Sequence, residues 1–414
     1  HILGDVVVTA LGITRDKKAL GYATQDVKSD KLNMTGNTDL TKSLQGKVVG
    51  VDLKNSSGMP GASSQVVIRG ARSFDGDNTP LYVVDGMPIA STSYYDTGNS
   101  VSGSDVANRA LDIDPNDIES VNILRGQAAA ALYGLRASNG AVIITTKSGK
   151  GKTIGKTNIS LTQTVAFDVV SRTPDYQTTW AQGMRGVYAS SKSNDNSHAS
   201  MAWGPKISDL PNDPLYGGNG KGHDGKYQVP QLIEGGYAPE DAWVTPGVYD
   251  NWNDYFRTGV QSTTSVLVSR AENTGTFAVG ISYTDQSGIA LKTGLEKWNA
   301  KANGDKKLND HFTVGFSANF SKNSVNKLSG ANDGSLAGVM GAPASYNLKG
   351  MPYRTASDPY KQVYYRSLTF DNPYWIQYNN TFSENTNRFF GNLFGQYETK
   401  LADDHKITLK YQLG

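Results

Sequence analysis

Seven segments after residue 156 alternate polar and apolar side chains, and this pattern constrains the fold more than any other feature. The segments are each about ten residues long, carry Tyr, Trp and Phe around them, and are separated by stretches rich in Gly, Asn, Asp and Ser. A period of two with aromatic flanks is typical of membrane β-strands, in which one face meets lipid and the other meets a wet interior. The segments are residues 157–170, 263–271, 276–286, 297–305, 311–323, 388–401 and 405–414.

Composition favours the same fold class. The chain has 414 residues, of which 19% are charged, with 45 Gly, 22 Tyr and no Cys. No run approaches the ~18 apolar residues of a membrane helix, so a membrane protein of this sequence would have to cross as a closed barrel. The net charge is only +2, and acidic and basic residues are interspersed, so the sequence predicts no basic surface for nucleic-acid binding. The absence of Cys excludes disulfides and thiolate metal sites.

The region before residue 150 has a different pattern, because helical and strand signals follow one another closely. Asp114 is placed to cap a helix, and Pro115 suits its first position. The predicted order is a one-turn helix at Asp114, a strand over 119–126, an alanine-rich helix over 127–133 that stops at Gly134, and a strand over 140–147. This order predicts a small α+β domain.

No residue pattern points to catalysis or to a metal. The five histidines are scattered, and the chain lacks a G-x-S-x-G motif. Asp112, Asp114 and Asn116 resemble the opening of a calcium loop, but Asp117 replaces the glycine that such a loop needs. Helix capping explains these carboxylates better. We therefore predict that the chain is not an enzyme and has neither a cofactor nor a metal site.

A set of phrases in the α+β region carries a family resemblance. They are SLQGKVVGV (43–51), SGMPGA from residue 57, VVIRG (66–70), PLYVVDGMPI (80–89), DIDPNDIESVNILRG (112–126) and ALYGLRASNGAVIITTK (131–147). In this order they resemble the plug domain of the SusC/RagA family of TonB-linked outer-membrane transporters. The later part of the chain is similar mainly in style, with a few phrases such as ISYTDQSGI (281–289).

The resemblance implies an α+β plug domain inside a transmembrane antiparallel β-barrel of about 22 strands. Residues 151–414 would supply only about seven to ten strands, and the open edges of such a sheet would be costly in lipid. We therefore expect only part of the barrel in this chain, and we interpret the start at His1 as that of a processed or partial product. The expected domains are a Ton box with a flexible segment (1–20), the plug (21–150) and the first part of the barrel with long outer loops (151–414).

The plug motifs imply specific contacts. In the family, the arginines of the IRG and LRG phrases face glutamates on the barrel wall, which makes Arg69 and Arg125 the candidates here. The alternative is that each pairs locally, for example with Asp85. The glycines that follow these strands permit the positive φ of a tight turn. The plug-motif residues are Gly70, Asp85, Gly86, Gly126, Tyr133, Gly134, Asn139 and Gly140.

The extreme N-terminus is a candidate binding segment for TonB. A short β-branched run can add as a strand to the edge of another protein. The run resembles the Ton box of the family, and the alternative is a plain first strand of the plug. Its residues are Asp5, Val6, Val7, Val8 and Thr9.

Residues 171–255 form the best candidate for an outer loop region that binds ligand. They contain Trp180, Trp203, Trp243 and Trp252 among Gly, Pro, Asn and Asp. Aromatic rings can stack on sugars and also pack against peptides, so the substrate class stays open. An aromatic girdle at the membrane interface is the alternative for several of these tryptophans.

The resemblance implies TonB-dependent import of oligosaccharide or peptide nutrients across the bacterial outer membrane. A SusD-like lipoprotein would capture the substrate, and two such complexes would assemble as a dimer. Because the inner membrane supplies the energy, no cofactor is implied. The alternatives are a solitary siderophore or cobalamin receptor, and a passive structural or adhesive barrel, which a plug with a Ton box disfavours.

Overall fold

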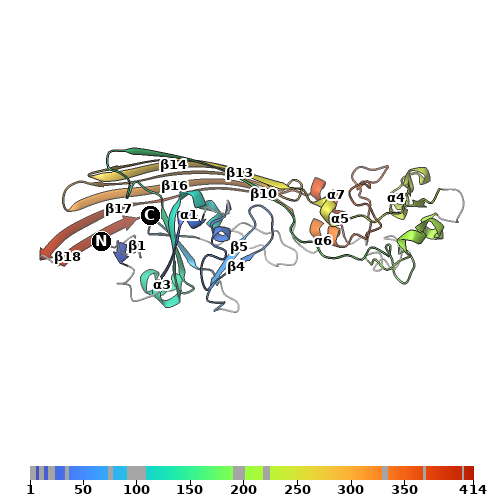
Figure 1. Ribbon diagram of the computed structural model, residues 1–414, viewed down its shortest axis with the longest axis horizontal. Coiled ribbons are helices and arrows are strands. Elements are labelled where there is room, and N and C mark those ends of the chain that lie inside the picture. Colours follow the sequence, from blue (N-terminus) through green and yellow to red (C-terminus); the bar gives the residue numbers. More distant parts are fainter. Residues whose placement is uncertain are drawn as a thin grey trace.

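The computed structural model describes residues 6–8, 14–16, 24–32, 37–72, 78–90, 109–189, 201–217, 224–328, 334–366, 370–402 and 405–414. Its largest element is one long sheet, which lies against an α+β domain near one end and continues at the other end into packed loops (Figure 1). We call these parts the long sheet, the α+β domain and the loop module.

The α+β domain is built on a five-stranded sheet in the order β3-β8-β9-β6-β7, with a separate hairpin β4-β5. β6 and β9 run parallel, whereas the other neighbours are antiparallel. The strands are β3 (Thr24–Lys28), β4 (Val51–Asn55), β5 (Ser64–Ile68), β6 (Leu81–Val84), β7 (Met87–Ile89), β8 (Ile118–Leu124) and β9 (Ala141–Thr146). The helical segments are α1 (Ser29–Leu32), α2 (Leu40–Ser43), η4 (Arg109–Asp112), η5 (Pro115–Asp117), α3 (Gly126–Tyr133) and η6 (Leu135–Ala137).

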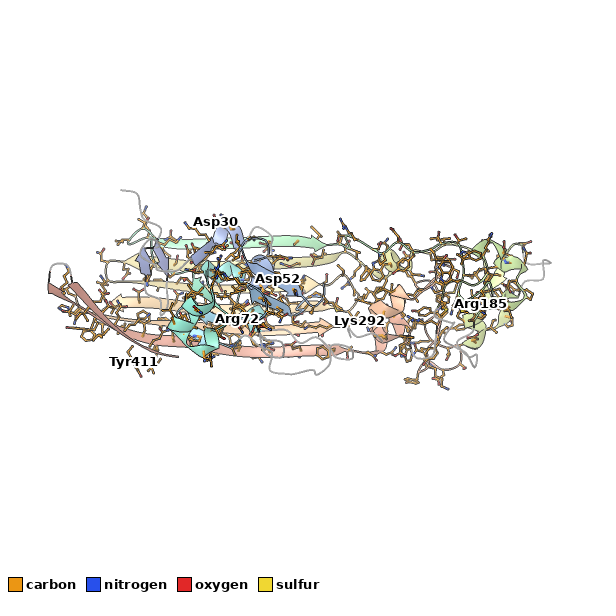
Figure 2. The ribbon with its side chains drawn as sticks, turned by 90° about the horizontal axis from the view of Figure 1, so that it is seen from below. Asp30, Asp52, Arg72, Arg185, Lys292 and Tyr411 are labelled. Carbon is orange, nitrogen blue, oxygen red and sulfur yellow. The ribbon has the colours of Figure 1, made fainter. Side chains whose placement is uncertain are left out.

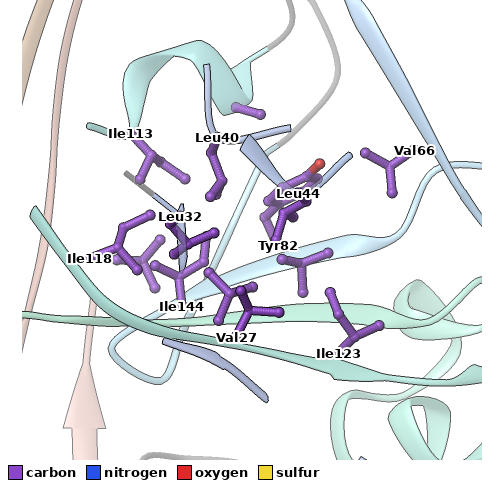
Figure 3. Packing of buried hydrophobic residues seen from close by; sticks show 14 of the residues in the cluster. Val27, Leu32, Leu40, Leu44, Val66, Tyr82, Ile113, Ile118, Ile123 and Ile144 are labelled. Carbon is purple, nitrogen blue, oxygen red and sulfur yellow. The ribbon is translucent and has the colours of Figure 1, made fainter. Parts of the chain in front are cut away.

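The central strand β9 is buried on both faces, so its residues enter two different cores. Val142 and Ile144 point into the larger core (Figure 3), which α1, α2 and the β4-β5 hairpin complete. Ala141 and Ile143 point into a smaller core, where Ala129 of α3 lies against them. Because neighbouring side chains of a strand alternate between faces, a continuous apolar run is what a doubly covered strand requires.

The long sheet contains seven strands in sequence order, and every neighbouring pair is antiparallel. Its inner face, toward the α+β domain, is polar: Lys297, Asn299 and Lys301 are buried there. Its outer face is apolar, and Trp298 between them is 45% exposed. The strands are β10 (Thr157–Asp168), β13 (Gly259–Glu272), β14 (Gly275–Ser287), β15 (Gly294–Lys307), β16 (Phe312–Lys327), β17 (Phe382–Ala402) and β18 (His405–Leu413).

The strand junctions are short at one end of the sheet and mostly long at the other. Residues 273–274 and 308–311 form short turns, whereas residues 169–258 and 328–381 leave the sheet at the opposite end. These two long connections form the loop module, which carries Arg185 and lies beyond Lys292, far from Asp52 and Arg72 of the α+β domain (Figure 2). Short turns on one side and long loops on the other are typical of outer-membrane barrels.

The loop module has its own core, drawn from both connections. Tyr216 and Tyr227 come from the first connection, and Tyr346 and Tyr365 come from the second. Asn251 joins them, because its amide donates to the carbonyls of Pro343 and Tyr346, at 3.1 and 2.8 Å. The helical and strand segments are η8 (Ile207–Asn212), η9 (Pro214–Tyr216), β11 (Tyr227–Gln228), α4 (Pro230–Glu234), η10 (Pro239–Ala242), β12 (Trp243–Val244), α5 (Asn251–Tyr255), α6 (Ser335–Met340) and α7 (Pro373–Asn379).

All seven alternating segments are strands, and most extend further than the sequence pattern indicated. The one-turn helix is also present as η5, with Asp114 as its cap. Gly134 ends α3 at φ +73°. In the described part of the chain, no helix is both long enough and apolar enough to cross a membrane.

Candidate functional site

The segment Arg109–Asp117 joins the α+β domain to the inner face of the long sheet. Two short 3-10 turns, η4 and η5, fold the segment so that Leu111 and Ile113 are buried. Asp114 caps the second turn by accepting from the Asn116 N–H at 2.8 Å, and Pro115 suits the first helical position. The remaining polar side chains of the segment are therefore directed at the sheet.

Asp112 is the centre of a buried ion cluster. Arg388 of β17 lies 3.0 Å from its carboxylate, and Arg109 lies 3.8 Å from it. The amide of Asn323 on β16 donates to the same carboxylate at 2.6 Å. The Asp112 side chain is only 1% exposed. A buried charge of this kind is stable only when its partners stay in place.

Arg109 extends the cluster to a second carboxylate. Its guanidinium lies 2.8 Å from Glu384 of β17, and Lys327 of β16 lies 3.6 Å from the same carboxylate. Arg109 also donates to the hydroxyl of Thr386 at 3.1 Å. An arginine of the α+β domain thus faces a glutamate of the long sheet.

Two inward lysines of β15 hold the backbone of the same segment. Lys297 donates to the carbonyls of Leu111 and, at 3.1 Å, Ile113. Lys301 lies 3.2 Å from the Asp117 carboxylate and donates to the Asp117 carbonyl at 2.9 Å. Burial raises the pKa of the Asp117 carboxyl above its ordinary value, and the charge of Lys301 opposes that shift.

Asp85 makes a second contact with the sheet at the turn after β6. Its backbone has φ +48°, and its carboxylate accepts from the Thr146 N–H at 2.9 Å and from the Ser317 hydroxyl of β16 at 3.0 Å. The amides of Asn392 and Gln412 reach the Asp85 carbonyl at 3.5 and 3.4 Å. A cavity of about 180 Å³ lies beside these groups. This contact is therefore looser than the ion cluster.

The tip of the β4-β5 hairpin reaches the loop module. Met59 belongs to the core of that module. A Cβ added to Gly61 would lie 2.7 Å from Val325, and one added to Gly288 would lie 2.8 Å from Pro60. The α+β domain therefore contacts the loop end of the long sheet as well as its inner face.

Comparison with known proteins identifies this arrangement. Residues 16–141 match the family model of the TonB-dependent Receptor Plug Domain. The chain is 26% identical over 426 residues to the TonB-dependent receptor SusC of Bacteroides thetaiotaomicron, a match that covers 98% of this chain and 36% of that protein. Residues 16–141 are thus a TonB-dependent receptor plug domain, and the chain resembles SusC along nearly its whole length. The TonB-dependent receptor P26 of Formosa agariphila is 27% identical over 321 residues, covering 78% of this chain and 27% of that protein.

A solved structure agrees on the fold. The RagAB peptide importer in its open-open state matches with a TM-score of 0.65 and 21% identity, covering 98% of this chain and 42% of that chain. The expected fold, an α+β plug with part of a transmembrane antiparallel β-barrel, is thus confirmed. The chain spans well under half the length of the relatives it matches. From here the α+β domain is called the plug, and the long sheet the barrel wall.

The two motif arginines make hydrogen bonds within the plug. Arg69 is exposed at φ +60°, and its N–H donates to Gly50 at 2.9 Å. Arg125 donates to the Val49 carbonyl at 3.1 Å and to Gln25 at 3.5 Å. Neither makes an ion pair with a carboxylate of the described residues, so their contact with wall glutamates stays a prediction.

Most of the other plug-motif residues lie at tight turns. The positive φ angles are 88° at Gly70, 86° at Gly86, 45° at Gly126, 73° at Gly134 and 101° at Gly140. Gly140 is also crowded, because an added Cβ would lie 2.8 Å from Ile68 and 2.9 Å from the Leu124 carbonyl. Tyr133 packs against the smaller core, and Asn139 directly precedes Gly140 and is partly buried. These positions are explained by backbone geometry and packing.

The proposed Ton box is only partly described. Val6, Val7 and Val8 form β1 (Val6–Val8), which pairs antiparallel with β2 (Thr14–Asp16). Asp5 and Thr9 lie outside the described residues. Binding of this segment to TonB stays a prediction.

The four tryptophans of the loop module differ in their surroundings. Trp203 is 58% exposed, and Lys206 lies 5.7 Å from the ring centroid of Trp180. Trp243 belongs to β12 and is partly buried. Trp252 packs edge-to-face on Phe256 at 5.4 Å between centroids. Their role in ligand binding therefore stays a prediction.

The sequence reasoning missed the ion cluster of the plug. It explained Asp112 and Asp114 by helix capping, which holds for Asp114 alone. A usable signal was present, because Lys297 and Lys301 occupy alternate, inward positions of a segment predicted as a membrane strand. A lysine on the inner face of a barrel needs a partner, and the acidic segment of the plug supplies it. Among the described residues, no group of three or more His, Asp or Glu side chains could hold a metal ion.

Proposed function

We propose that this chain is the plug and first barrel section of an active importer for oligosaccharide or peptide nutrients in the bacterial outer membrane. One observation carries the proposal: the plug lies against the polar inner face of membrane-type strands, fastened there by a buried ion cluster around Asp112. Nutrients could pass through a barrel closed in this way only if the plug moves. Energy coupling through TonB is the means implied by the family.

The proposed division of the chain is a Ton box with a flexible segment (1–20), a plug (21–150) and a barrel section (151–414). It is supported by the family match over residues 16–141 and by the start of the first wall strand at Thr157. TonB would bind Asp5 to Thr9 and pull on the plug from the side of the short turns. Arg69 and Arg125 are proposed to meet glutamates of the barrel wall.

Contacts of the plug support a coupling between substrate capture and plug movement. The hairpin tip at Met59 and Pro60 contacts the loop end of the barrel wall, where substrate would arrive. The ion cluster lies further along the same wall. Substrate that binds at the loops would therefore act on the hairpin tip, before TonB acts on the opposite end of the plug.

A SusD-like surface lipoprotein is the proposed partner, with the assembly a dimer of two such complexes. The names of relatives support this, since one is SusC and a structural match is the RagAB peptide importer. The tyrosine-rich loop module, with Trp180, Trp203, Trp243 and Trp252, is the proposed contact region for sugar or peptide. The alternative is a solitary receptor for a siderophore or cobalamin.

Two measurements test this function. The full-length protein is first purified from outer membranes in mild detergent, and its companions are identified by mass spectrometry. A stoichiometric SusD-like lipoprotein is the expected result, whereas a receptor that elutes alone favours the solitary alternative. Uptake of labelled oligosaccharides and peptides is then compared in cells with and without TonB. Uptake that is equal in both would overturn the proposal of active import.

A further inference from the structure

A groove of about 430 Å³ lies on the outer face of the barrel wall, near the short turns. It arises because Gly304 of β15 lies between Phe277 and Phe316 on the neighbouring strands, and a glycine has no side chain to fill the space between the rings. The groove is in the middle of the sheet, since β14, β15, β16 and β17 all contribute. Its apolar lining consists of Phe277, Val314, Phe316 and Leu393.

The end of this groove at the short turns is charged. Lys306 points outward two residues beyond Gly304 and lines the groove together with Glu272, Thr274 and Asp305. Both carboxylates already have basic partners, since Glu272 lies 3.1 Å from Arg270 and Asp305 lies 3.8 Å from Lys150. Within the described ranges, no carboxylate lies within 4.0 Å of the Lys306 ammonium, so Lys306 adds a positive charge that these pairs do not neutralise. An apolar slot that ends at a cation matches an amphiphile with an anionic head.

We propose that this groove binds one glycerophospholipid of the leaflet on the short-turn side. One acyl chain lies between Phe277 and Phe316 over Gly304, and the phosphate lies at Lys306. Its volume is in the usual range for ligand pockets, and basic side chains at the membrane surface attract lipid phosphates. A glycine within a strand often marks a close approach of this kind. This site is independent of the proposed substrate.

The test uses the full-length receptor, stripped of lipid in detergent and titrated with phosphatidylglycerol under native mass spectrometry. Lys306→Gln removes the charge, and Val314→Trp fills the groove from its exposed rim without touching the plug. Lys322→Gln is the matched control, because Lys322 also points outward from the wall but lies opposite Trp298, away from the groove.

We expect one lipid that is retained at low concentration by the parent and by Lys322→Gln. Its affinity should fall about fivefold in Lys306→Gln, and most of the binding should be lost in Val314→Trp. Equal binding by all four proteins would overturn the proposal, because it would indicate a general lipid belt. Retention of lipopolysaccharide in preference to phosphatidylglycerol would also overturn it.

Discussion

Replacing Asp112 by Asn should loosen the plug far more than its small change in shape suggests. The substitution keeps the size of the side chain but leaves Arg109 and Arg388 without the carboxylate that lies 3.8 and 3.0 Å from them. Removing one partner of a buried ion pair costs about 3 to 5 kcal/mol. Glu384 still partners Arg109, so the lower value of about 3 kcal/mol is the better expectation.

Hydrogen exchange of the following strand, Ile118–Leu124, measures this loss. A free energy of opening lowered by about 3 kcal/mol raises the exchange rate about a hundredfold. The matched control is Asp52→Asn, since Asp52 is 61% exposed and lies 3.7 Å from Lys54 in an ion pair of the plug surface. Such pairs contribute at most about 1 kcal/mol. Equal exchange in both variants would refute the reasoning that the cluster fastens the plug.

Three further predictions follow from single positions. Gly140→Ala should lower the free energy of unfolding of the plug by about 1 to 3 kcal/mol, because φ is +101° and the added Cβ would be crowded. Gly151→Ala, where φ is also positive but the Cβ would lie in open space, should lower it by less. Urea unfolding measures both losses. Val7→Pro should weaken binding to the periplasmic domain of TonB in a pull-down, because strand addition uses backbone N–H groups; unchanged binding would disprove the Ton box. Burial raises the pKa of Tyr255 and of Tyr374 from 10 to about 12. The stability that these two residues give the loop module is therefore complete below pH 10 and is lost as the pH rises to 12. Absorbance titration of the phenolates checks this, and ionisation of both tyrosines at pH 10 would contradict it.

The strands of the barrel wall could be predicted from sequence because the surroundings of each strand determine the pattern of its own residues. Lipid on one face and a polar plug on the other impose a period of two, so Trp298 and Lys297 differ although they are neighbours. The same holds for Asp114 and Pro115, whose capping role depends on residues within one turn. These predictions needed no knowledge of distant contacts.

The candidate site could not be predicted in this way, because its pairs join distant parts of the chain. Asp112 meets Arg388, 276 positions later, and this contact depends on the register of every strand between β13 and β17. The fully buried Lys297 side chain likewise meets backbone carbonyls, which carry no sequence signal. The core of the loop module was missed for a similar reason, since its tyrosines show no period.

The shared core of the loop module links two connections that leave different strands of the wall. Tyr216 and Tyr227 of the first connection pack in one core with Tyr346 and Tyr365 of the second. Strands β13 to β16 lie between the two connections along the chain. Burial of these tyrosines therefore depends on the pairing of four strands, so a shift of register within the wall would open the core of the loop module.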